Sequence, residues 1–213
     1  MKERQMKERH MKAAIRAAAV ATTMFVLSTP LHAQLLYVGV RGGAGVPSGT
    51  FADPAQPAAN DGVLRGAKIG FGYGVDAGVG LGPLGVYAGY DRIDFDCDAC
   101  ASNAKYKLSG VSAGVRLGVP LFPIVKPWVK AGLTFNEINT TATGSGVTKI
   151  ATDRGPGYEV GAGIDIPILG LFAISPQARY VGQKLDLKGL YSGAKTNVSY
   201  YTFDIGLKAK TPF

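Results

Sequence analysis

The end of the chain alternates between apolar and polar side chains with a strict period of two. From Tyr201 to Lys210 every even-numbered residue is threonine, aspartate, glycine or lysine. The odd-numbered, apolar residues are Tyr201, Phe203, Ile205, Leu207 and Ala209, and the chain ends on Phe213. Because successive side chains of a β-strand point to opposite faces, this pattern predicts a strand with one apolar face. Its length suits the ~9–11 residues with which a strand crosses a bilayer.

The same alternation recurs upstream, in segments separated by glycine, proline and polar residues. It predicts seven further strands, at residues 35–46, 67–79, 84–95, 106–119, 128–135, 158–166 and 172–180. Short turns rich in proline and glycine are predicted at residues 80–83, 120–123 and 167–170. Long polar loops are predicted at residues 47–66, 136–156 and 182–197, with a shorter loop around Cys97 and Cys100.

Short turns and longer loops therefore alternate along the chain. An even number of antiparallel strands with this asymmetry is typical of small outer-membrane barrels. We predict an all-β fold, an eight-stranded antiparallel transmembrane up-and-down β-barrel with both termini on the periplasmic side. The length of 213 residues suits one domain.

A soluble up-and-down barrel of the lipocalin kind would show the same period of two. Its polar face would meet water and carry many lysine, glutamate, threonine and glutamine residues. Here the polar face is mostly glycine and serine with single charges, which suits the narrow interior of an eight-stranded barrel. Tyrosines suited to membrane interfaces lie near the strand ends, at Tyr73, Tyr90, Tyr158, Tyr180 and Tyr201. We therefore expect the apolar face to contact lipid.

Residues 1–33 have the features of a secretory signal peptide. A basic segment precedes an apolar run at residues 17–27, and the small Ala33 suits the position before a cleavage site. The run is too short for the ~20 residues of a membrane-spanning helix. We expect export through the Sec pathway and cleavage after Ala33, which leaves residues 34–213 as the barrel. A repeated Met-Lys-Glu-Arg makes Met11 an alternative start.

The net charge of the chain gives no sign of a nucleic-acid partner. The chain carries +8, but residues 1–33 hold half of it, with six lysine or arginine residues against two glutamates. The remaining charge is spread along the sequence without a basic run. A nucleic-acid site would need clustered basic residues, so we expect none.

The segment 34–213 resembles the small OmpA/OmpX/opacity-type β-barrels, often labelled porin-like. The resemblance rests on the eight-strand pattern and on the final strand, which is similar to the C-terminal assembly signal of bacterial outer-membrane barrels. In this chain the signal comprises Tyr201, Phe203, Ile205, Leu207 and Phe213. The resemblance implies a monomer in the outer membrane, surrounded by lipid and lipopolysaccharide and inserted by the barrel-assembly machinery. Pro176 departs from the pattern, because a mid-strand proline removes a ladder hydrogen bond or marks a bulge.

The distribution of histidine argues against an enzyme. His10 and His32 both lie in the predicted signal segment. Outer-membrane barrel enzymes generally use histidine as a base or as the partner of a nucleophile. We therefore predict no catalytic residue and no cofactor.

The loop near Cys97 contains a pair of cysteines and a run of aspartates, which raises the questions of a disulfide and of a metal site. Cys97 and Cys100 are expected to form a disulfide in an oxidising compartment, since a redox-active pair would usually start a helix. Asp94, Asp96 and Asp98 imitate the start of a calcium loop. That motif needs glycine at its sixth position and glutamate at its twelfth, and this sequence has neither. We predict a solvated acidic loop and no metal site.

Charged residues on the polar faces are predicted to form a network inside the barrel. Counting from the short turns places Asp91, Lys130, Glu159, Arg179 and Asp204 in one layer. A second layer, nearer the turns, would hold Arg41, Asp76, Arg116 and Lys208. Glu159 would contact Lys130 and Arg179, and Arg179 would also face Asp204. Buried charges are costly unless they pair, and the alternating signs on adjacent strands allow pairing.

Two functions remain open at this point. The first is a structural or surface-interaction role, in adhesion or envelope integrity, through the loops 47–66, 136–156 and 182–197. The composition of these loops names no ligand. The alternative is a narrow channel for ions or small solutes, gated by rearrangement of the lumen salt bridges. A packed lumen favours the first function, and an open path favours the second.

Overall fold

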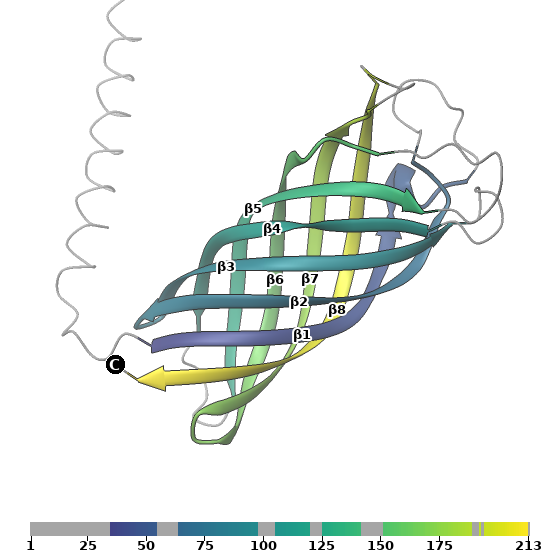
Figure 1. Ribbon diagram of the computed structural model, residues 1–213. Helices are drawn as coiled ribbons and strands as arrows, with labels where there is room; N and C mark the ends of the chain where they lie inside the picture. Colours follow the sequence, from purple (N-terminus) through teal and green to yellow (C-terminus); the bar gives the residue numbers. More distant parts are fainter. Residues whose placement is uncertain are drawn as a thin grey trace, which may run out of the picture.

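The computed structural model describes residues 35–54, 64–97, 105–119, 125–141, 151–188, 192 and 194–212. Within them, eight antiparallel strands form a closed barrel in sequence order, with the first strand paired to the last (Figure 1). The strands are β1 (Leu35–Ser48), β2 (Ala67–Leu81), β3 (Leu84–Cys97), β4 (Lys105–Gly118), β5 (Lys126–Thr141), β6 (Gly155–Leu169), β7 (Phe172–Asp186) and β8 (Lys195–Pro212). A short 3-10 helix, η1 (Gly49–Phe51), follows β1. The predicted fold is confirmed.

The predicted signal peptide, the alternative start at Met11 and the cleavage position after Ala33 lie outside the described residues. Of the helices in the described part, none is long and apolar enough to cross a membrane.

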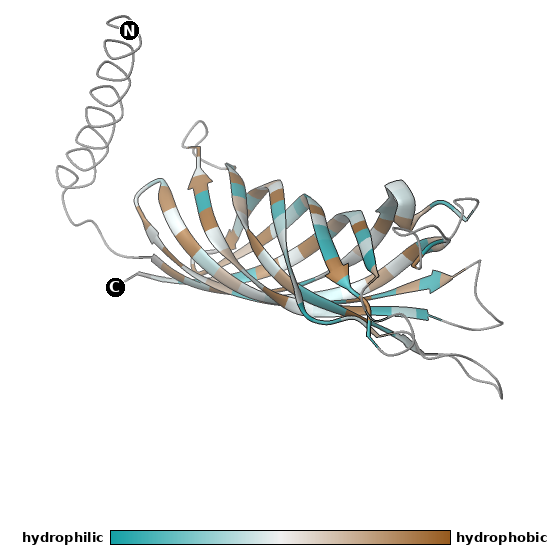
Figure 2. Cartoon of the chain, turned by 90° about the horizontal axis from the view of Figure 1, so that it is seen from above, coloured by the Kyte–Doolittle hydropathy of each residue, from teal (hydrophilic) through white to brown (hydrophobic). Residues whose placement is uncertain are grey.

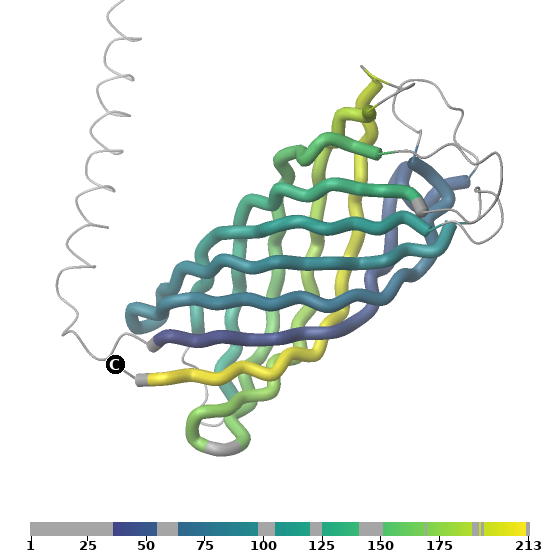
Figure 3. The backbone as a smooth tube through the Cα atoms, in the orientation of Figure 1, coloured from purple at the N-terminus to yellow at the C-terminus, as the bar shows by residue number. Residues whose placement is uncertain are grey.

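The two described hairpin turns lie at the same end of the barrel as the end of β8 (Figure 3). Gly82 and Gly170 have positive φ angles of 63° and 45°, a backbone conformation that favours glycine. The prediction of a turn over residues 167–170 was wrong: β6 continues through a bulge to Leu169, and the turn is Gly170–Leu171. The shift matters because it places Asp165 well inside a strand.

Pro176 leaves the strand register intact. Gly163 pairs with Gln177 on one side of it, and Ile166 pairs with Ile174 on the other, in the same register. Arg179 consequently keeps its inward orientation and is buried.

The outer surface of the barrel carries an apolar belt, and apolar residues recur along the strands in Figure 2. Exposed aliphatic and aromatic side chains occupy alternate positions, among them Val38, Val40, Val86, Val115, Val129, Leu133, Val160, Phe203, Ile205 and Leu207. In a bilayer these side chains contact lipid, as the period of two predicts. Tyr73, Tyr90, Tyr158, Tyr180 and Tyr201 also face outward or lie partly exposed. Tyr180 lies between Tyr158 and Tyr201, with ring centroids 6.1 and 5.0 Å away.

Toward the loop end, the same positions still point inward, but the polarity of the two faces reverses. On β3 the inward residues change from Asp91 to the buried Ile93 and Phe95, while the outward residues become Arg92 and Asp94. A similar change occurs on β4, β5, β7 and β8, and together these residues produce a loop-end apolar cluster. Its members are Phe51, Leu64, Ala67, Ile93, Phe95, Tyr106, Leu108, Ile138, Val181, Leu185, Leu187, Val198 and Tyr200. The physical reason is that strands beyond the bilayer meet water outside and must bury apolar residues inside.

This extension corrects the predicted loops at 136–156 and 182–197. β5 continues to Thr141, β7 continues to Asp186, and β8 already begins at Lys195. These segments resembled loops in the sequence because their outward residues are polar. The buried residues that alternate with those polar residues show that the segments are strands.

Candidate functional site: the charged lumen

Charged side chains fill the middle of the barrel. We call this group the central charge cluster. It comprises Arg41, Asp76, Asp91, Lys130, Glu159, Arg179 and Asp204. Three of its side chains are cationic and four are anionic, a formal net charge of −1. Every residue in it comes from an inward-facing position of a strand.

Arg179 lies at the centre of this cluster. Its guanidinium contacts Asp91 (Nη1–Oδ2 3.1 Å), Glu159 (Nη1–Oε2 3.2 Å) and Asp204 (Nη2–Oδ2 3.1 Å). Its Nε donates to the hydroxyl of Thr202 at 3.1 Å. Asp91 belongs to β3 and Arg179 to β7, so this pair joins opposite walls of the barrel rather than adjacent strands.

Arg41 ties β1 into the same cluster. Its Nη2 donates to both carboxylate oxygens of Asp91, at 2.7 and 2.8 Å, and its Nη1 pairs with Asp76. Gly74 makes room for this pair. A Cβ at that position would lie 2.6 Å from Asp91 Oδ1 and 3.0 Å from Arg41 Cζ. Glycine on the inner face is thus a packing requirement of the bulky charged side chains opposite it.

Glu159 is surrounded by donors. Besides Arg179, it accepts from Lys130 Nζ at 3.2 Å and from the hydroxyl of Tyr87 at 2.5 Å. The Lys130 ammonium also lies 4.5 Å from the centre of the Tyr87 ring. Only 1% of Glu159 is exposed. A carboxylate this buried is stable in its charged form because cations and hydrogen bonds replace its water.

A second group lies nearer the short turns. We call it the mouth cluster, and it comprises Arg116, Asp165, Lys208 and Lys210. Asp165 accepts from Arg116 at 2.8 Å, from Lys208 at 3.2 Å and from Lys210 at 2.5 Å. The indole of Trp128 and the hydroxyl of Ser175 also donate to it, at 3.0 and 2.9 Å. With three cations and one carboxylate, this cluster has a formal net charge of +2.

The structure arranges the predicted charges differently from two separate layers. Arg41 and Asp76 were expected beside Arg116 and Lys208, but Arg41 instead joins the central charge cluster through Asp91. Asp165 and Lys210 were not among the predicted network residues. Both lie on inward faces that the alternation identifies. Asp165 fell within the predicted strand 158–166, one residue from its end, and was left out of the predicted network.

The other predicted residues are those of the C-terminal assembly signal and of the disulfide. Tyr201, Phe203, Ile205 and Leu207 of the assembly signal form part of the outer belt, and Phe213 lies outside the described residues. Cys97 ends β3 and is disulfide-bonded. Its predicted partner, Cys100, is outside the described part, so the pairing stays a prediction.

The acidic residues near Cys97 are paired with cations. Asp94 lies 3.7 Å from Arg92, and Asp96 lies 3.0 Å from Lys105. Asp98 is outside the described part. In the portion of the chain that the structure describes, no group of three or more histidine, cysteine, aspartate or glutamate residues could hold a metal ion.

Three solved barrels are similar to this chain. Neisserial surface protein A has a TM-score of 0.62 at 19% identity, over 83% of this chain and 97% of that one. OprG from Pseudomonas aeruginosa has a TM-score of 0.51 at 16% identity, over 84% and 97%. Ail of Yersinia pestis, in complex with the heparin analogue sucrose octasulfate, has a TM-score of 0.50 at 13% identity, over 84% and 99%. At these identities the likeness shows the fold.

No curated protein sequence matches the chain. Residues 17–210, however, match the family model described as "Outer membrane protein beta-barrel domain". The match spans most of the chain and all of the described strands except the last residues of β8. Together with the closed eight-stranded barrel and its apolar belt, it supports an outer-membrane location. The chain belongs to the outer-membrane protein beta-barrel domain family.

Proposed function

We propose that this protein is a closed barrel that acts in the bacterial outer membrane as a structural or surface-interaction protein, in adhesion or envelope integrity. The loop end, with the sequence segments 47–66, 136–156 and 182–197, is the part that meets the exterior. Both termini face the periplasm, after Sec-dependent export and insertion by the barrel-assembly machinery. The protein acts as a monomer surrounded by lipid and lipopolysaccharide, and no catalytic role is assigned to it.

The observation that carries the proposal is the contact between opposite walls at Arg179. An ion moving along the lumen would have to pass the Arg179–Asp91 pair, which spans from β7 to β3. Only 4% of Arg179 is exposed. Arg179 is also held by Glu159 and Asp204, and Asp91 by Arg41. Removing one partner of a buried pair costs about 3–5 kcal/mol, because a buried charge loses its compensation.

The loop-end apolar cluster adds a second closure above the charges. Phe95 and Leu108 are fully buried there, and Phe51 of η1 packs against Phe95 with ring centroids 5.3 Å apart. A hydrated ion meets an apolar barrier at this level. Both closures favour the structural role over the channel.

The decisive experiment is a conductance measurement on the refolded barrel in a planar bilayer. Heat-shifted migration on a gel shows that the sample is folded, and a porin of known conductance controls for insertion. We expect no steady openings. Openings whose size changes in Glu159→Gln or Lys130→Met variants would establish the gated channel instead.

The surface role is tested on cells. One strain displays the native barrel, and another displays a variant whose residues 55–63 and 142–150 are replaced by glycine-serine segments of equal length. Equal surface amounts are verified by labelling. We expect the variant to lose adhesion to host-matrix coatings or to admit large antibiotics, while the barrel stays folded. Unchanged adhesion and permeability would contradict a role for these segments.

A further inference from the structure

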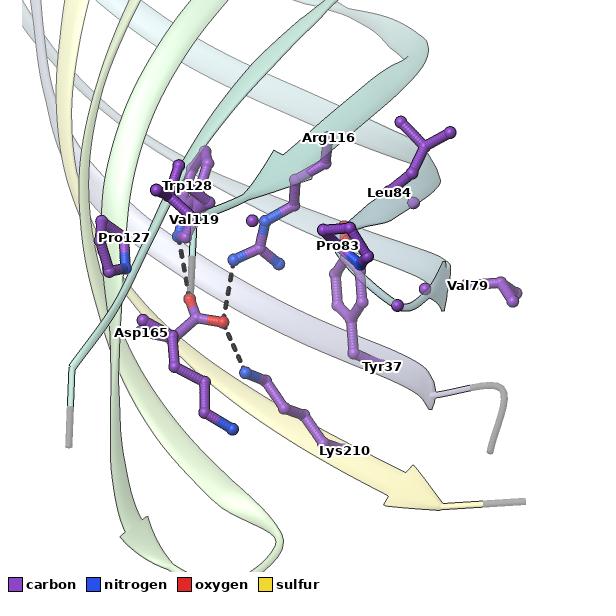
Figure 4. A pocket seen from close by; sticks show the side chains of 15 residues that line it. Tyr37, Val79, Pro83, Leu84, Arg116, Val119, Pro127, Trp128, Asp165 and Lys210 are labelled. Carbon is purple, nitrogen blue, oxygen red and sulfur yellow. Dashed lines mark hydrogen bonds and ion pairs between the residues drawn. The ribbon is translucent and has the colours of Figure 1, made fainter. Parts of the chain in front are cut away.

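The barrel contains a cavity at its short-turn end, and this cavity is open to the outside at that end. Its volume is about 520 Å3. Its apolar and aromatic lining residues include Tyr37, Pro83, Val119, Pro127 and Trp128, whereas the side chains of Val79 and Leu84 point away from Asp165 (Figure 4). Arg116, Lys126, Asp165 and Lys210 supply its charged groups. Because the central charge cluster lies beyond it, the cavity is a blind pocket rather than a pore entrance.

The charges of this pocket do not balance. Asp165 is the sole carboxylate of the mouth cluster, and it is already shared by Arg116, Lys208 and Lys210. Figure 4 shows Arg116 and Lys210 approaching the same carboxylate from different strands. A guanidinium has five N–H donors and an ammonium has three, so both retain donors beyond those given to Asp165. Lys126, which is exposed, adds a further positive charge at the pocket wall.

Aromatic rings hold two of the cations in place. The Arg116 guanidinium lies 4.3 Å from the Trp128 ring centre and 5.4 Å from that of Tyr37. The Lys208 ammonium lies 4.6 and 5.4 Å from the same two rings. Ring faces attract cations and position them without neutralising their charge. The mouth cluster therefore keeps its net charge of +2 beside low-dielectric walls, where attraction for an anion is strong.

We propose that this pocket binds a phosphate monoester that carries an apolar group. A phosphate monoester has a charge of about −1.5 to −2 and three strong acceptor oxygens, which matches the excess charge and the free donors of Arg116 and Lys210. The apolar wall accommodates the rest of the molecule. The ester is either a soluble molecule or a lipid headgroup, and both share this chemistry. In the orientation proposed above, the pocket opens toward the periplasm.

Trp128 reports on this site directly, because it is the only tryptophan of the protein and its indole lies in the pocket wall. The folded, full barrel in detergent is titrated with phenyl phosphate, inorganic phosphate and benzoate at constant ionic strength, and tryptophan fluorescence is followed. We expect a saturable change with phenyl phosphate. Inorganic phosphate lacks the apolar contact and should bind more weakly, and benzoate, with a single charge, more weakly still.

The variant Lys210→Gln removes one charged donor from the pocket. It should weaken phenyl phosphate binding about tenfold or more, the loss expected for one charge-assisted hydrogen bond. Lys184→Gln is the matched control, since Lys184 is exposed on the outer face toward the loop end, and it should bind like the parent. Short-chain phosphatidic acid, added to the same micelles, distinguishes the two sources: tighter binding than phenyl phosphate assigns a lipid headgroup, and weaker binding assigns a soluble ester.

Three results would overturn the proposal. They are the absence of a saturable fluorescence change in a barrel shown to be folded by its gel shift, equal binding by the Lys210→Gln and parent proteins, and benzoate binding as tightly as phenyl phosphate. The last result would mean that the pocket attracts anions by charge alone.

Discussion

Arg179 on β7 pairs with Asp91 on β3, four strands away around an eight-stranded barrel, with Nη1 and Oδ2 3.1 Å apart. A contact between neighbouring strands would leave the lumen open, but this one crosses it. Arg41 holds the same Asp91 from β1. Ion pairs therefore connect opposite strands across the interior of the barrel, and the charged side chains do more than line its wall.

Replacing Arg179 by methionine should destabilise the folded barrel by about 3–5 kcal/mol, because Asp91, Glu159 and Asp204 lose a shared cation in a buried site. Urea titration in detergent or lipid vesicles, followed by gel shift, measures the change. Arg92→Met is the control. Arg92 is 40% exposed at the side chain and lies 3.7 Å from Asp94, and exposed pairs contribute only about 0–1 kcal/mol. Equal effects of the two substitutions would contradict the bracing role.

Glu159→Ala should lower stability in the same assay by about 3–5 kcal/mol, since Lys130 and Arg179 lose their common carboxylate. Glu137→Ala serves as the comparison, because Glu137 pairs with Arg154 at the exposed loop end, 3.7 Å away. A Glu159 variant as resistant to urea and heat as the parent would remove Glu159 from the network.

Gly74→Ala should destabilise the barrel by about 1–3 kcal/mol, the usual range for overpacking. The added methyl would lie 2.6 Å from Asp91 Oδ1 and would push Asp91 away from Arg41. Gly42→Ala on β1 provides the control, because a Cβ there would approach only the carbonyl oxygen of Gly72, at 3.8 Å. The urea concentration at the unfolding midpoint should be clearly lower for Gly74→Ala than for Gly42→Ala. Identical midpoints would show that the central charge cluster tolerates the extra volume.

Phe95→Ala should loosen the loop-end extension, with a loss of about 3–5 kcal/mol as for other buried phenylalanines. Phe95 is fully buried and lies 5.3 Å from Phe51 and 5.4 Å from Tyr200, measured between ring centroids. Hydrogen exchange should rise in the loop-end halves of the strands and stay low in the apolar belt. Phe71→Ala, at an outward position that is 74% exposed, should leave this exchange pattern unchanged. Uniform exchange across both halves would argue against a separate loop-end core.

Two arginine substitutions on β4 locate the membrane boundary. Val115→Arg places a charge on the apolar belt and should cost about 2–4 kcal/mol in lipid vesicles, as expected near the bilayer midplane. Ser109→Arg lies on the same outer face, closer to the loop end and between Arg92 and Glu137 of the neighbouring strands. It should cost about 0–1 kcal/mol. A large penalty at both positions would place the boundary nearer the loops than the reversal of the alternation suggests.

Much of this structure can be predicted from local pattern. The strict alternation from Tyr201 to Lys210, and its repeats, suffice for strand number, barrel class and the inward orientation of residues such as Asp91 and Arg179. This is because side-chain direction in a strand depends only on whether a position is odd or even. The pattern is less informative at the loop end, where the outward residues become polar and the inward residues apolar. Beyond Phe135 and Val181, polar outward residues such as Glu137 and Lys184 indicate loops. Only the burial of Ile138 and Leu185 shows that the strands continue.

The sequence by itself determined the fold class and the inward face of each strand within the membrane. The contacts between charges on adjacent strands, such as Glu159 with Lys130 and Arg179, were named from the alternation. Only the tertiary structure decided which charges meet across the lumen. Strand tilt and stagger in a closed barrel place residues from distant strands at one height, so Arg179 reaches Asp91 across the lumen and Arg41 belongs with them rather than with Arg116. The same geometry gathers three cations around Asp165. This excess of positive charge at the short-turn pocket cannot be read from a sequence whose charges are evenly spread.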